Sequence, residues 1–136
     1  IRPHHLFCLL GFKGFGYSRA FVNNMRRISD MIKKGHEFRV NLVIGEDDIC
    51  LFCPHLSNSN CLKKPDSEIV LQKKEQKIVS LLNVDTSDTV ILSVLYEKMR
   101  EKFTLNMLDN LCSDCQWYSM GDCKKGFKNL KKGGFL

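Results

Sequence analysis

The clearest pattern along the chain lies between residues 18 and 35, where apolar side chains recur at spacings of three and four residues. That spacing places them on one face of a helix. Ser18 is a typical N-cap, and Gly35 is a typical stop after a basic last turn. We therefore predict an amphipathic helix over this segment. Its apolar positions are Phe21, Met25, Ile28 and Ile32.

The first half of the chain shows two further patterns on either side of that helix. An apolar segment at residues 4–12 runs into a glycine-broken stretch at 11–17, which we interpret as a loop packed by its aromatic side chains. Residues 38–44 alternate between polar and apolar positions and are rich in β-branched side chains, which indicates a strand.

In the second half of the chain, the pattern of apolar positions predicts a brief strand at 69–71 and two helices. The first helix runs from the N-cap candidates at 85–88 to about Phe103, and the second begins at Thr104 and leads to a pair of cysteines. Together the elements predict an α+β fold that is mainly α-helical, with a short β element. The buried positions that we predict here are Ile78, Val79, Leu81, Leu82, Ile91, Val94, Leu95, Met99, Leu105, Leu108 and Leu111.

Length and charge indicate one domain with a basic end. The chain has 136 residues, of which 43% are hydrophobic and 26% charged, so disordered and coiled-coil architectures fit poorly. The net charge of +6 comes mostly from five lysines after residue 123, where there is no acid. We predict a single cysteine-rich domain over 1–123 and a basic C-terminal tail over 124–136 that frays. Since the body is nearly neutral, we do not expect nucleic acid as a partner.

The chain lacks the sequence features of membrane and secreted proteins. It has no apolar run of about 18 residues, and its first residues do not resemble a secretory signal. We therefore expect a cytoplasmic protein with no membrane contact. Seven cysteines are many for such a protein, and in a reducing compartment this number favours metal or redox chemistry over disulfides.

Six of the cysteines form a repeat. Each half of the repeat has two residues between its first two cysteines and seven before the third, a C-x2-C-x7-C triad. A C-x-x-C turn directs both sulfurs and nearby backbone N–H groups at one centre, which stabilises thiolates that hold a metal. The repeat therefore predicts a metal-binding domain. The triads are Cys50, Cys53 and Cys61, and Cys112, Cys115 and Cys123.

Each triad is one ligand short of the four that a tetrahedral zinc site or a cubane cluster takes. Cys8 is our first choice for a fourth ligand, although it lies in an apolar run where a core cysteine is equally common. His4 and His5 are weaker candidates, because a capping or hydrogen-bonding role suits each of them better, and His55 and His36 are weaker still. Whether the triads form two sites or one is left open by the sequence.

The third cysteine of each triad favours iron–sulfur over zinc. Two C-x-x-C pairs on one zinc ion would leave Cys61 and Cys123 without a role, whereas a cluster uses the whole triad. We therefore expect one or two iron–sulfur clusters, [4Fe–4S] in type, in a protein of electron transfer, cluster handling or redox sensing. Its partner would be a redox or cluster-transfer protein, with Phe52, Trp117 and Tyr118 shielding the cluster.

Two other functions remain as alternatives. The first is a zinc-stabilised binding module whose lysine-rich tail contacts nucleic acid or an acidic protein. The second is an enzyme in which Cys8, beside His4 and His5, acts as a nucleophile. No third group to orient such a pair can be named, and the sequence identifies no reaction, substrate or oligomeric state.

The chain also resembles a known family. Residues 2–12, followed by Gly14, Gly16-Tyr17-Ser18 and Phe21, are similar to the opening of domain of unknown function 1284, a bacterial and archaeal family. The similarity continues through Asp47-Asp48-Ile49-Cys50 with Cys53-Pro54. It ends with residues 108–118, the last two of which are Trp117-Tyr118. The resemblance implies iron–sulfur binding, which is itself inferred from cysteines in that family, and it implies no activity.

Overall fold

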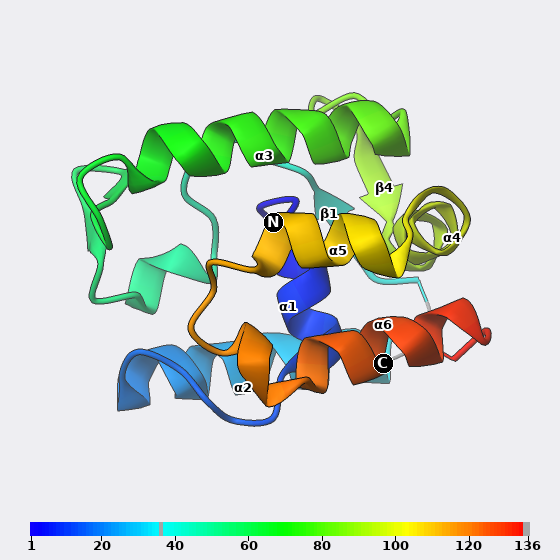
Figure 1. Ribbon diagram of the computed structural model, residues 1–136, viewed down its shortest axis with the longest axis horizontal. Helices are drawn as coiled ribbons and strands as arrows, with labels where there is room; N and C mark the ends of the chain where they lie inside the picture. The colour runs from blue at the N-terminus through cyan, green and yellow to red at the C-terminus, as the bar shows by residue number, and fades with distance from the viewer. Residues whose placement is uncertain (36, 135–136) are drawn as a thin grey trace.

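The computed structural model describes residues 1–35 and 37–134 of the chain, which form a mainly helical α+β domain (Figure 1). Two small antiparallel pairs accompany the helices, β1 with β4 and β2 with β3. The helices are α1 (His5–Gly11), α2 (Arg19–Lys34), α3 (Ser67–Leu82), α4 (Leu92–Lys102), α5 (Leu105–Cys112) and α6 (Asp122–Lys131), with 3₁₀ turns η1 (Cys50–Phe52) and η2 (Tyr118–Met120). The strands are β1 (Arg39–Asn41), β2 (Leu56–Ser57), β3 (Asn60–Cys61) and β4 (Thr89–Ile91).

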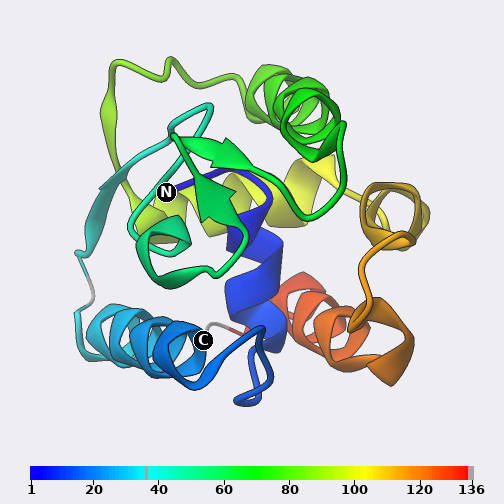
Figure 2. The same ribbon diagram turned by 90° about the vertical axis from the view of Figure 1, so that its left-hand side faces the viewer.

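The short helix α1 lies at the centre, with the longer helices around it (Figure 2). Its side chains Leu6, Phe7 and Leu9 are buried, and the ring of Phe7 lies 5.2 Å from that of Phe103 and 5.9 Å from that of Phe127. Burial of these apolar groups is the main stabilising contribution to the fold. The N-terminal apolar segment of the sequence is therefore the core helix of the domain.

The close approach of α1 and α6 depends on two glycines. A Cβ at Gly126 would lie 2.2 Å from the carbonyl oxygen of Leu10, and one at Gly11 would lie 2.6 Å from the Cα of Cys123. Only a residue without a side chain allows two backbones to come this near. The contact fixes the start of α6 against the last turn of α1.

Helix α2 confirms the clearest prediction from the sequence. The Oγ of Ser18 accepts a hydrogen bond from the N–H of Phe21 at 3.1 Å, as an N-cap does. The predicted strand at 38–44 is present but shorter, as β1. Helix α5 likewise begins after Thr104, whose hydroxyl accepts from the N–H of Met107.

The strand predicted at 69–71 is wrong, because these residues belong to helix α3. Ile69 is 61% exposed, whereas the inward face of α3 carries the buried acids Glu68 and Glu75 beside Ile78 and Leu82. A pattern that assigns charged residues to the surface cannot identify such a face.

The predicted start of α4 is also wrong. Residues 89–91 form β4, which pairs with β1 so that Val90 lies opposite Val40, and the helix begins only at Leu92. Its buried face includes Leu92 and Tyr96, whereas Val94 is exposed. The predicted burial of Leu95 and Met99 is confirmed.

The lysine-rich end is not a frayed tail over the part that the structure describes. Helix α6 packs against α1 and α4, and its Phe127 and Leu130 are buried in the common core. The prediction of a frayed tail rested on the number of lysines in this segment and overlooked the two apolar positions among them. Among the described residues, none of the helices combines the length and apolar character needed to cross a membrane.

Candidate metal centre

The two C-x-x-C pairs adopt the same backbone turn. The N–H of Cys53 donates to the carbonyl of Cys50 at 2.8 Å, and that of Cys115 donates to Cys112 at 2.9 Å. In both cases the second cysteine's carbonyl then accepts from the residue three positions later. The repeat in the sequence is therefore a repeat of local structure.

The third cysteine lies on a different kind of element in each triad. Cys61 lies on β3 of a hairpin whose turn residues Asn58 and Ser59 have φ of 47° and 62°, and Cys61 faces Leu56 across the pair. Cys123 instead lies in the first turn of α6, after Gly121 at φ 80°. Amide groups at a helix N-terminus stabilise thiolate charge, which suits Cys123 to metal binding.

All seven cysteines line one cavity of about 330 Å³. The hairpin that carries Cys61 and the α5–α6 connection lie on either side of α1, green and orange in Figure 2. His4, His5, Tyr17 and Trp117 also line the cavity. The fold thus gathers cysteines from three separate segments around one space.

Cys8 lies with the second triad. Burial raises the pKa of its thiol well above the usual value, and the nearby thiols of Cys112, Cys123 and Cys115 raise it further. The α1–α6 contact accounts for this position, because Gly11, one turn after Cys8, touches the backbone of Cys123. Cys8 and the three cysteines of the second triad are therefore neighbours in the cavity.

In the first triad, Cys53 and Cys61 are neighbours, whereas Cys50 lies beside His5 and Asp47. Burial raises the pKa of the Cys53 thiol, with a further contribution from Cys61. Burial, followed by the Asp47 carboxylate, raises the pKa of Cys50 to about 12, and burial raises that of Cys112 to about 12. Such thiols stay protonated in a metal-free protein, since each thiolate would be buried beside other negative groups.

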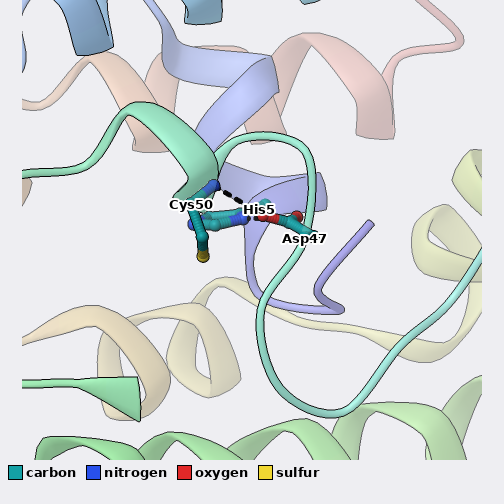
Figure 3. A group of neighbouring side chains, drawn as sticks. All are labelled: His5, Asp47 and Cys50. Atoms are coloured by element: carbon teal, nitrogen blue, oxygen red, sulfur yellow. Dashed lines mark hydrogen bonds and ion pairs between the residues drawn. The ribbon is translucent and has the colours of Figure 1, made fainter. Parts of the chain in front are cut away.

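Asp47 holds the start of the first triad in place (Figure 3). Its Oδ1 accepts the N–H groups of Ile49 and Cys50 at 3.0 and 2.9 Å, and its Oδ2 accepts the N–H of Arg2 at 2.7 Å and lies 2.8 Å from the Nδ1 of His5. Burial alone would raise the pKa of Asp47, but His5 and these hydrogen bonds hold it well below its usual range. Asp47 is therefore ionised and its oxygens are occupied.

The side chain of Arg2 continues this network to α3. Its Nε donates to Glu75 at 2.5 Å and its terminal nitrogens donate to Glu68 at 3.0 and 3.2 Å. Glu68 in turn accepts the N–H of Cys61 at 2.8 Å. The sequence analysis missed these buried charges. The available clue was that Glu68 and Glu75 are seven residues apart and so share one face of a helix.

His4 is paired with the same network. Its Nδ1 lies 2.8 Å from Glu75, whose side chain is fully buried. Burial, and then the neighbouring His5, lower the pKa of His4 to about 4, so its ring is neutral at pH 7. His4 and His5 therefore both have carboxylate partners, which agrees with the hydrogen-bonding role predicted from the sequence.

Residues 16–121 match the model of a family described as "Protein of unknown function (DUF1284)". The chain belongs to this DUF1284 family. No curated protein and no solved structure matches it significantly. The match includes Cys50, Cys53, Cys61, Cys112 and Cys115, whereas Cys8, Cys123 and the opening residues 2–12 lie outside it.

Within the DUF1284 match, an aromatic cluster joins the two triads. The ring of Tyr17 lies 4.4 Å from that of Trp117 and 4.6 Å from that of His55, and its hydroxyl accepts from the Nζ of Lys63 at 3.1 Å. Burial raises the pKa of Tyr17, and thiols of both triads raise it further. Tyr17 therefore lies between the two triads.

Of the remaining residues that the sequence singled out, some line the cavity and others do not. Among the residues described, His55 packs on Tyr17 but does not line the cavity, and Phe52 is 51% exposed, so its predicted shielding role is wrong. Tyr118 lines the cavity and its hydroxyl donates to Asp109. His36 lies outside the described residues.

Proposed function

We propose that this DUF1284 protein is an iron–sulfur protein that holds two clusters and transfers electrons. One observation carries the proposal: all seven cysteines, from three segments of the chain, line one cavity. One set of ligands would be Cys8 with the second triad, whose thiols are neighbours. The other would be the first triad, in which Cys53 neighbours Cys61 and Cys50 lies beside His5. Thiolates in sets of three or four are the ligands of iron–sulfur clusters.

The sulfurs are not spaced as the ligands of a single zinc ion are. Four thiolates around one zinc ion lie about 3.8 Å apart, given a Zn–S bond of about 2.3 Å. Among the described residues, no three cysteine sulfurs lie within 4.8 Å of one another. A cluster distributes its ligands over several irons and so takes thiolates that are farther apart.

Rigid support of the ligands favours electron transfer over cluster delivery. Asp47 and Glu68 anchor the N–H groups of Cys50 and Cys61. On the other side, the Nζ of Lys74 donates to the carbonyl of Leu111 at 3.1 Å and to Asp114 at 2.8 Å. Ligands held this firmly suit a cluster that stays in place and accepts or releases single electrons. A redox protein is the partner that this function requires.

The test is the content of iron, acid-labile sulfide and zinc in protein purified without oxygen, together with its visible spectrum. We expect about eight irons and eight sulfides per chain for two cubane clusters. The variants Cys8→Ser and Cys61→Ser are matched, since each removes one ligand from a different set, and each is expected to lower the iron content by about half.

Three outcomes would contradict the proposal. Zinc without sulfide would make the protein a zinc-stabilised module. Loss of all iron in both serine variants would mean that the seven cysteines hold one cluster. Cluster handling in place of electron transfer would appear as rapid loss of iron to an apo-ferredoxin mixed with the loaded protein.

A further inference from the structure

The first triad has a histidine beside its first cysteine. Potential ligand atoms of His5, Asp47 and Cys50 lie within 4.8 Å of one another, and this is the one such group among the described residues (Figure 3). The two oxygens of Asp47 already accept hydrogen bonds from Arg2, Ile49 and Cys50. Asp47 is therefore a support for the group, which leaves His5 and Cys50 as ligands.

The hydrogen bond to Asp47 determines which nitrogen of His5 is free. Nδ1 of His5 lies 2.8 Å from Oδ2 of Asp47 and is therefore engaged by the carboxylate. Nε2 is the ring nitrogen left to bind a metal. No described residue donates a hydrogen bond to Nε2, although the His5 side chain is only 12% exposed and lines the cavity. A carboxylate on the far nitrogen is the arrangement that orients histidine ligands in metal sites.

The position of His5 on α1 matches that of Cys8. The two residues are three positions apart on one helix, so they lie on the same face, one turn from each other. Cys8 lies with the second triad, while His5 lies beside Cys50 of the first. Helix α1 is therefore placed to add one ligand to each triad.

The other histidines are less suited to this role. His4 is held by Glu75 and belongs to no group of three potential ligands within 4.8 Å among the described residues. His55 follows the first pair of cysteines, but its ring packs on Tyr17 and does not line the cavity.

We propose that His5 is the fourth ligand of the cluster held by Cys50, Cys53 and Cys61, that it binds through Nε2, and that Asp47 orients it. This inference rests on the proposed function. A neutral imidazole in place of a thiolate removes one negative charge from the cluster, which raises its reduction potential. The two clusters of the chain then differ, and the first electron resides on the cluster bound by His5.

The experiment is pulsed EPR on the dithionite-reduced, iron-loaded protein, prepared once with natural histidine and once with ¹⁵N-histidine. We expect a hyperfine coupling to one directly bound nitrogen that changes from the ¹⁴N to the ¹⁵N pattern on labelling. The variant His5→Cys is expected to retain iron and sulfide, to lose this coupling and to lower the potential of one cluster. The control His55→Ala is expected to keep the coupling and both potentials.

The labelling experiment needs no substitution, so it tests the inference even where His5→Cys folds poorly. An iron-loaded protein without nitrogen coupling, or a coupling that persists in His5→Cys, would overturn the assignment of His5 and leave the proposed function intact. A preparation with zinc and no sulfide would overturn the proposed function and this inference together.

Discussion

Arg2 and Glu68 form a buried ion pair that connects the start of the chain to the first triad of cysteines. The Nη2 of Arg2 lies 3.0 Å from Oε1 of Glu68, and Oε2 of the same carboxylate accepts the N–H of Cys61. The backbone N–H of Arg2 donates to Asp47, which in turn accepts the N–H of Cys50. One residue therefore supports two of the three cysteines in that triad.

Replacement of Arg2 by methionine is expected to destabilise the protein strongly. Arg2→Met fills similar space but leaves Glu68 and Glu75 buried without their cationic partner. Breaking a buried ion pair in this way costs about 3–5 kcal/mol. The measurement is the free energy of unfolding in urea. The control Arg19→Met, at an exposed position, should change it by less than about 0.5 kcal/mol, and an equally small change for Arg2→Met would mean that the network is not stabilising.

Replacement of Gly126 by alanine is expected to separate α6 from α1. The new Cβ would lie 2.2 Å from the Leu10 carbonyl oxygen, so the helices must move apart. Overpacking of this kind costs about 1–3 kcal/mol, against a gain of about 1 kcal/mol from replacing glycine within a helix.

Unfolding in urea and the iron content measure the effect of Gly126→Ala. We expect lower stability and less iron, because Cys123 moves away from Cys8. At Gly35 a Cβ would meet its nearest atom at 3.8 Å, so Gly35→Ala is the matched control and should change neither quantity. Wild-type iron content in Gly126→Ala would show that the close helix contact does not position the second set.

The thiols of the metal-free protein are expected to react slowly at neutral pH. The pKa values of Cys50 and Cys112 rise from 9.0 to about 12, so their thiolate fraction at pH 8 is much smaller than in the unfolded chain. Since the unfolded chain loses these protons first, the metal-free protein also becomes less stable as the pH rises from about 9 towards about 12.

Alkylation by iodoacetamide, followed by mass spectrometry of each cysteine, measures this reactivity. The folded, metal-free protein should be labelled at Cys50 and Cys112 far more slowly than the same protein in urea, and the difference should shrink as the pH rises. Equal rates at pH 8 would contradict the raised pKa values.

Part of the fold follows from local sequence. Helix α2 was predictable with its cap because the capping hydroxyl, the apolar spacing and the terminal glycine lie within one segment. Helix α3 was not, because its inward face carries Glu68 and Glu75, whose burial depends on Arg2 more than 60 residues away. The start of α4 was missed for a similar reason, since residues 89–91 become a strand only by pairing with β1.

The sequence by itself determined the two C-x2-C-x7-C triads and the turns that close them, because those turns depend on residues within a few positions of each other. Only the tertiary structure decided which residues join each triad. Cys8 lies with the second triad because two glycines let α1 touch α6, and His5 lies beside the first because Asp47 is held by the N–H of Arg2. Such neighbours come from packing between distant segments, which spacing along the chain does not record.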